Sequence, residues 1–192
     1  MTSSTVAPRR ESPARRRVLD TALALFYAEG IHAVGIDRII AEAGVAKATF
    51  YHHFPSKDDL ICAYLEEQIT LVQGHAAPRG DTPEEKIVSV FEAIGEITCK
   101  PGFRGCAFIN AAAEYPDPDH PVRRVVDTFR WWFRDTLEKL LVAAGHPDPE
   151  CTALMLLALR DGLAVAGDLD DPATAGPAVR SAVTRLIAPS AA

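Results

Sequence analysis

The stretch over residues 35–57, GIDRIIAEAGVAKATFYHHFPSK, constrains the fold of this chain more than any other. Apolar residues repeat at helical spacing in its first half and stop at Gly44, which can take a positive φ without steric cost. A second helix over 46–53 is too short to be stable alone in water, so it must pack on neighbours through Phe50 and Phe54. The pattern predicts two short helices joined by a tight turn.

The outward face of the second helix is small, polar or aromatic, and it carries no acid. At about 100° per residue, Ala48 and His52 point away from the apolar face, while Thr49 and Tyr51 lie on its flanks. A surface of this kind suits the floor of a DNA major groove. Lys57 falls in the first turn of the helix that follows.

These residues resemble the DNA-binding domain of TetR-family transcriptional regulators. The matching positions are AlaLeuPhe–x3–Gly30, Ile36, Ile39, Ala43, Gly44, Val45, Thr49, Phe50, Tyr51, Phe54, Lys57 and Leu60. The resemblance implies an all-α fold of about nine helices. It implies a three-helix DNA-binding domain with a helix-turn-helix over 13–56, and a larger helical bundle for ligand binding and dimerisation over 57–192. Residues 1–12 are rich in Ser, Thr, Pro and Arg, and we expect them to form a disordered basic arm.

The resemblance also implies a set of DNA contacts. The candidate residues are Lys47, Ala48, Thr49, Tyr51, His52, His53 and Lys57. By resemblance, Tyr51, His52 and Lys57 touch phosphates, and the positive end of its helix assists Lys57. Lys47 and Thr49 would reach base edges, and the alanine between them would touch a thymine methyl or allow close approach. The alternative is an ordinary exposed helix face.

Two positions depart from the family pattern. Gly35 and Ala46 stand where hydroxyl side chains usually cap the two helices, so no phosphate contact is assigned to them. The arginines at 9, 10 and 15–17 could lie along phosphates or in an adjacent minor groove, or could serve only as a solubilising tail.

The net charge of −6 is unevenly distributed. Residues 1–60 carry eight Lys or Arg and seven Asp or Glu, a net of +1, and the remaining residues carry twelve against nineteen, a net of −7. Phosphate affinity depends on local basic groups, so the overall sign does not exclude DNA binding.

Composition narrows the other classes of function. No apolar run approaches the ~18–20 residues of a membrane span, and the N-terminal arginines precede no secretory apolar stretch, so we expect a cytoplasmic protein without membrane contact. Four scattered cysteines without a CxxC pair argue against zinc and disulfides. No cofactor is expected. An enzyme is disfavoured because no nucleophile–base pair, metal-ligand spacing or phosphate-binding loop is present.

The rest of the chain also shows helical patterns. We expect helices over 14–29, 57–73, 83–99, 103–115, 122–144, 149–167 and 173–188, with a capping box at Thr82 and Leu71 facing inward. The helix over 149–167 is apolar nearly all round and must be buried on several sides. It is therefore predicted to pair, together with the helix that follows, with its copies in a homodimer.

The second domain contains candidate ligand and redox groups. The candidate pocket residues are Phe91, Phe103, Phe108, Asn110, Glu114, Phe129, Arg130, Trp132, Met155 and Asp161, each of which could equally be plain core. Cys106 neighbours Arg104, which could make it a reactive thiolate, although small buried cysteines are commoner than sensors. Asp117, Asp119 and His120 favour a turn and a helix cap over a metal site.

The resemblance to TetR-family regulators implies a ligand-responsive repressor, a homodimer that holds a palindromic operator in double-stranded DNA until an unknown small molecule binds. The alternatives are an activator, a regulator without a ligand, a thiol-sensing regulator that uses Cys106, and a helical small-molecule carrier or enzyme.

Overall fold

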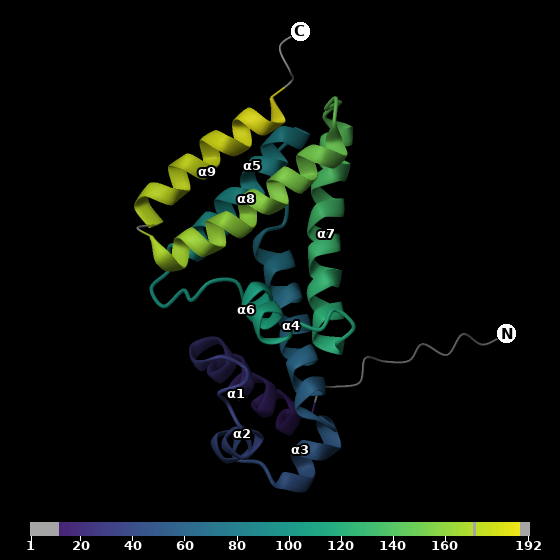
Figure 1. Ribbon diagram of the computed structural model, residues 1–192, viewed down its shortest axis with the longest axis vertical. Coiled ribbons are helices and arrows are strands. Elements are labelled where there is room, and N and C mark those ends of the chain that lie inside the picture. The colour runs from purple at the N-terminus through teal and green to yellow at the C-terminus, as the bar shows by residue number, and fades with distance from the viewer. Residues whose placement is uncertain (1–11, 171, 189–192) are drawn as a thin grey trace, which may run out of the picture. The chain divides into compact units, whose positions relative to one another are not determined.

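The computed structural model describes residues 12–170 and 172–188. Within these ranges the regular elements are all helices: α1 (Pro13–Glu29), α2 (Ile36–Ala43), α3 (Lys47–His53), α4 (Lys57–His75), α5 (Pro83–Thr98), α6 (Ala107–Glu114), α7 (Pro121–Ala143), α8 (Pro149–Leu169) and α9 (Pro172–Ile187) (Figure 1). The all-α prediction is confirmed. The expected disordered arm falls outside the described residues, apart from Ser12.

The chain divides into two compact units, and the division falls inside α4, between Tyr64 and Leu65. The first unit contains α1, α2, α3 and the first half of α4. The second contains the remainder of α4 and the five helices that follow. The sequence had placed the domain boundary at the start of α4, before Lys57.

The first unit is organised around the apolar stripe of α1. Val18, Ala22, Leu25 and Phe26 are buried, as their helical spacing predicts. The helix ends at Gly30, which takes a φ of 91° and donates its N–H to the carbonyl of Phe26.

The predicted turn between α2 and α3 is present. Gly44 lies in the left-handed region with a φ of 59°, and the N–H of Val45 reaches back to the carbonyl of Ile40 at 3.3 Å. This geometry stops α2 and redirects the chain within three residues. Phe50 and Phe54 are both buried, so α3 docks through its apolar face.

Side-chain caps define the starts of two longer helices. Ser56 Oγ accepts from the N–H of Asp59 at 3.1 Å, and Asp59 Oδ2 accepts from the N–H of Ser56 at 2.9 Å. The same reciprocal arrangement joins Thr82 and Glu85 at the start of α5. Backbone N–H groups of Thr82 and Asp81 donate to the Glu85 carboxylate and lower its pKa. The capping box at Thr82 confirms the prediction made from the sequence.

The core of the second unit is formed by α5, α7, α8 and α9. Its buried side chains include Ile87, Phe91, Phe133, Leu137, Leu141, Leu156, Leu163 and Val183. The inward stripe of α7 begins at Val122 and ends at Leu141, close to the predicted limits of that helix.

Three expectations for the second unit need correction. The helix predicted over 103–115 begins only at Ala107, because Gly102 and Gly105 take φ values of 82° and 76° that no helix can include. Leu71 was expected inward but is 44% exposed. Met155, expected in a pocket, is 43% exposed on α8.

Candidate nucleic-acid interface and cavities

The outer face of α3 is accessible, as the sequence predicts. Lys47, Ala48, Tyr51 and His52 are exposed, and Thr49 is half-buried beside them. Because α3 has no side-chain cap and only seven residues, its position depends on the burial of its two phenylalanines. The packing of Phe50 and Phe54 in the core therefore positions the exposed face of α3, which has no capping side chain.

Two of the candidate DNA-contact side chains already have polar partners on the surface. Lys47 Nζ lies 3.2 Å from Asp37 Oδ1 of α2, and both side chains are exposed. His53 Nε2 lies 3.2 Å from Ser12 Oγ at the start of α1. Exposed pairs contribute little stability, so DNA can displace Asp37 from Lys47 at small cost.

Lys57 is placed differently from the other candidates. It is half-buried, its Nζ donates to the carbonyl of Ile31 at 2.7 Å, and it lies 5.9 Å from the centroid of the Phe26 ring. The side chain thus ties the start of α4 to the segment after α1. An ammonium group has three donors, so this contact and a phosphate contact are compatible.

The arginines of α1 that the structure describes make internal contacts. The guanidinium carbon of Arg15 lies 5.1 Å from the centroid of the Phe54 ring. Arg16 Nε donates to Asp20 at 2.8 Å. Arg17 Nε donates at 3.3 Å to the carbonyl of Ala43, which is among the last carbonyls of α2 that lack a helical partner. The arginines at 9 and 10 lie outside the described residues.

An exposed ion-pair network joins α1 to α2. Arg38 donates to both oxygens of Glu29, at 2.6 and 2.9 Å, and its Nε donates to Glu42 at 2.7 Å. Hydrogen bonding to Arg38 lowers the pKa of Glu29. Arg38 was not among the residues predicted to be important, although its i,i+4 spacing to Glu42 was a signal visible in the sequence.

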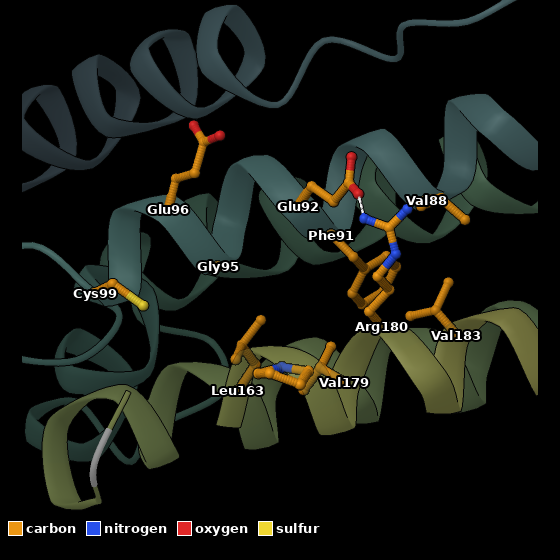
Figure 2. A pocket seen from close by; sticks show the side chains of 11 residues that line it. Val88, Phe91, Glu92, Gly95, Glu96, Cys99, Leu163, Val179, Arg180 and Val183 are labelled. Carbon is orange, nitrogen blue, oxygen red and sulfur yellow. Dashed lines mark hydrogen bonds and ion pairs between the residues drawn. The ribbon is translucent and has the colours of Figure 1, made fainter. Parts of the chain in front are cut away.

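A cavity of about 570 Å³ in the second unit lies between α5, α8 and α9. Its walls are mostly apolar, with Phe91, Leu163 and Val183 among them. Figure 2 shows Arg180 reaching across from α9 to form an ion pair with Glu92 of α5. Phe91 is the one predicted pocket residue that lines this cavity.

A second cavity of about 250 Å³ lies between α6, α7 and α8. Its lining residues are Phe108, Ile109, Ala112, Arg123, Val126, Asp127, Phe129, Arg130 and Arg160, and we call it the arginine cavity. Three predicted pocket residues meet here: Phe108, Phe129 and Arg130. A fourth, Asp161, accepts from Arg130 Nη1 at 2.6 Å.

Besides Asp161, which lies behind the arginine cavity, five predicted pocket residues line neither of these cavities. The Phe103 ring packs against Gly167, where a Cβ atom added to the glycine would lie 3.2 Å from the ring. The Asn110 amide donates to the carbonyl of Arg104 at 2.9 Å, and Trp132 packs on Phe129 and Phe133. The remaining two are Glu114, half-buried at the end of α6, and the exposed Met155.

Cys106 has a different arginine beside it from the one its sequence neighbourhood suggested. The thiol is buried, and Arg160 Nη2 lies 3.0 Å from its Sγ. Arg160 also donates to Asp161 at 2.9 Å and lies 5.0 Å from the centroid of the Phe129 ring. Burial opposes its charge, but Cys106 and Asp161 outweigh that cost and raise the pKa of Arg160. The signal for this contact in the sequence is the position of Arg160 inside the apolar run of α8.

No group of three or more His, Cys, Asp and Glu side chains in the described part of the chain is arranged to hold a metal ion. Among the described helices, none combines the length and apolar character that crossing a membrane requires. His120 instead caps α7, where its Nδ1 accepts from the N–H of Val122 at 3.3 Å.

A helix-turn-helix with an accessible second helix, followed by a separate helical bundle with cavities, defines a DNA-binding regulator. The family model described as "Bacterial regulatory proteins, tetR family" matches residues 18–64. SCO4454, a TetR-family transcriptional regulator from Streptomyces coelicolor, is 45% identical, with a TM-score of 0.86 over 91% of this chain and 94% of that one. The chain belongs to the TetR family of transcriptional regulators.

Two further comparisons agree. The structure of a putative TetR transcriptional regulator from Streptomyces avermitilis, sav143, is 28% identical, with a TM-score of 0.82 over 92% of this chain and 97% of that one. The HTH-type transcriptional regulator YjdC from Escherichia coli K12 is 25% identical over 152 residues, or 77% of this chain and 80% of the relative. Regulators of this family bind DNA and dimerise.

Proposed function

We propose that this protein is a cytoplasmic, dimeric repressor that holds a palindromic operator and releases it when a small molecule binds the second unit. The observation that carries the proposal is the outer face of α3, which is exposed and free of acids, while Phe50 beneath it is fully buried. In this proposal residues 13–56 bind DNA, and residues 57–192 bind the effector and the second subunit.

The polar groups of α3 divide into base-reading and phosphate-binding sets. Lys47 and Thr49 face the base edges, and the small side chain of Ala48 allows close approach. Tyr51, His52 and Lys57 bind phosphates, which fixes the register of α3 in the groove. His53 contributes less, because its ring already contacts Ser12.

A second subunit supplies the specificity that one short helix lacks. The helix α8 exposes four large apolar side chains, Leu154, Met155, Val165 and Leu169. Exposed apolar groups in such numbers commonly mark a protein–protein interface. In the proposed dimer these residues, with α9, pair with their copies. The two α3 helices then occupy half-sites about 34–36 Å apart, or a multiple of that distance.

Release follows if the effector prefers one of two conformations of the dimer, since only a differential affinity shifts an equilibrium. The helix α4 begins in the first unit and ends in the second, so we assign transmission of the shift to it.

Selection of bound duplexes from randomised DNA tests the proposal. It should return a palindrome, and light scattering at micromolar concentration should give the mass of a dimer. A pool without sequence preference would favour the helical carrier or enzyme instead, and a monomer would remove the two-half-site mechanism. Transcription from the selected operator, with and without the protein, separates a repressor from an activator.

A thiol-sensing regulator is the second candidate, favoured by the contact between Cys106 and Arg160. A guanidinium lies 3.0 Å from Sγ, and reactive cysteines sit beside positive charges of this kind. In this case hydrogen peroxide or N-ethylmaleimide releases the operator from the wild type and from Cys99→Ser, but not from Cys106→Ser. Unchanged operator binding of the treated wild type would dispose of it.

A further inference from the structure

The arginine cavity has more positive than negative charge. Three guanidinium groups line it, from Arg123, Arg130 and Arg160. The carboxylates are Asp127 on the lining and Asp161 behind it, which is shared between Arg130 and Arg160 at 2.6 and 2.9 Å. Among these arginine and aspartate side chains, three positive charges face two negative ones, which leaves a net charge of +1.

Two of these arginines also have buried donors that lack an acceptor. Among the described residues, the buried side-chain nitrogen or oxygen atoms without a hydrogen-bond partner are Arg123 Nε, Arg134 Nε and Arg160 Nε. Two of the three belong to the arginine cavity. Arg160 is only 6% exposed, so water does not easily satisfy its donor. Native proteins rarely leave such groups unpaired unless a ligand or ion completes them.

The remaining walls are flat and apolar. The rings of Phe108 and Phe129 stack with centroids 3.8 Å apart and planes 8° apart, and Ile109, Ala112 and Val126 complete the lining. The volume of about 250 Å³ lies below the ~300–1,000 Å³ of pockets for drug-sized ligands. The occupant must therefore be small, with room for about one ring.

We propose that the arginine cavity binds a small monoanionic aryl carboxylate, and that this is the effector class of the regulator. The carboxylate accepts hydrogen bonds from Arg123 and Arg160, in the geometry for which guanidinium groups are suited. The ring lies against Phe108 and Val126. Asp161 and the Cys106 thiol are positioning groups that hold the Arg160 guanidinium at the cavity. The effector role rests on the proposed function, while the binding site does not.

Calorimetry of the full-length protein with benzoate and phenylacetate tests the charge requirement, with benzamide and phenylacetamide as neutral partners of the same shape. Both carboxylates should bind at least 10-fold more tightly than their amides. Equal affinity within each pair, or no binding of any probe at millimolar concentration, would overturn the proposal.

A matched pair of variants tests the location. Arg123→Met removes a lining guanidinium, whereas Arg124→Met removes the exposed neighbouring one, which does not line this cavity. Carboxylate affinity should fall at least 10-fold in Arg123→Met and stay within 2-fold of wild type in Arg124→Met. Helicity and thermal unfolding without ligand establish that both variants are folded. Equal loss in both, or in neither, would place binding elsewhere.

A gel shift on the selected operator separates this inference from the proposed function. Release by benzoate or phenylacetate but not by the amides supports both. If a neutral compound releases the operator while carboxylates fail to bind, the proposed anion site is refuted and the proposed repressor function is supported. If carboxylates bind as expected but the protein does not bind DNA, the proposed function is refuted and the proposed anion site is supported. Binding without any effect on operator affinity would refute the effector role alone.

Discussion

Replacing Lys57 with methionine removes two interactions from the start of α4 at once. One is the charge-assisted hydrogen bond to the Ile31 carbonyl at 2.7 Å, of a kind that contributes about 1.5–3 kcal/mol. The other is the cation–π contact with Phe26 at 5.9 Å, of a kind worth ~0.5–1 kcal/mol at accessible sites. Methionine keeps the apolar contact of the side-chain stem, so we expect a net loss of about 2 kcal/mol in local stability.

Amide hydrogen exchange measures that loss where it occurs. A cost of about 2 kcal/mol corresponds to exchange ~30-fold faster in α1 and in the first turns of α4. The same variant should weaken every DNA sequence alike. The slope of log affinity against log salt concentration should fall by about 0.9, the value for one lost phosphate contact.

Lys47→Met is the matched control, because its pair with Asp37 is exposed on both sides. Its exchange rates should stay close to those of the wild type, while operator binding weakens by about 1–3 kcal/mol and sequence preference relaxes. The assignment of Lys57 as both a structural contact of α4 and a phosphate ligand would be refuted by either of two results. One is a Lys57→Met variant with unchanged amide exchange rates and an unchanged salt dependence of DNA affinity. The other is the same behaviour in both variants.

Three further predictions concern other parts of the chain. Met155→Glu places a charge on the exposed apolar face of α8, where we propose the dimer interface, and should give the mass of a monomer in analytical ultracentrifugation. The mass of a dimer for this variant would place the interface elsewhere. Thr82→Ala removes the hydroxyl that accepts from the N–H of Glu85 and should lower the free energy of unfolding, measured in urea, by about 1 kcal/mol. No change would mean that the capping box does not stabilise the protein. Arg38→Gln should raise the pKa of Glu29 toward 4.5 by NMR titration. Because the pKa of Glu29 is lowered in the folded protein, its pairing with Arg38 stabilises the fold above pH 4.5, and this stabilisation is lost as the pH falls through the folded-state pKa. The variant should therefore be less stable than the wild type at neutral pH but nearly equal to it in acid. An unchanged pKa of Glu29 would contradict the pairing.

The helix-turn-helix could be predicted from sequence because its determinants are local. Gly44 marks the turn, Ser56 and Asp59 mark a helix start, and the spacing of Phe50 and Phe54 marks the buried face. Each of these signals lies within a few residues of the structure that it specifies. The family match then placed those signals in one known arrangement.

The contacts of the second unit depend on residues far apart in the chain. Arg104, two residues before Cys106, was the expected partner, but Arg160 fills that role from 54 positions away. The early start assigned to α6 has a similar cause, because the left-handed conformation of Gly105 is invisible in a run of otherwise helix-compatible residues. Aromatic residues could not be sorted into lining and core, since both obey the same helical spacing, as Phe129 and Trp132 do.

The continuity of α4 has a consequence for anyone who recombines regulators of this kind. The helix contains 19 residues and is about 28 Å long, and the boundary between the units falls inside it without a linker. Deleting one residue within α4 would turn everything beyond it by about 100° and shift it by about 1.5 Å. An insertion of seven residues would restore the facing to within about 20°. A chimera that exchanges the second unit must therefore join the two helix halves in register, because in the proposed mechanism α4 transmits the effect of ligand binding to the DNA-binding unit.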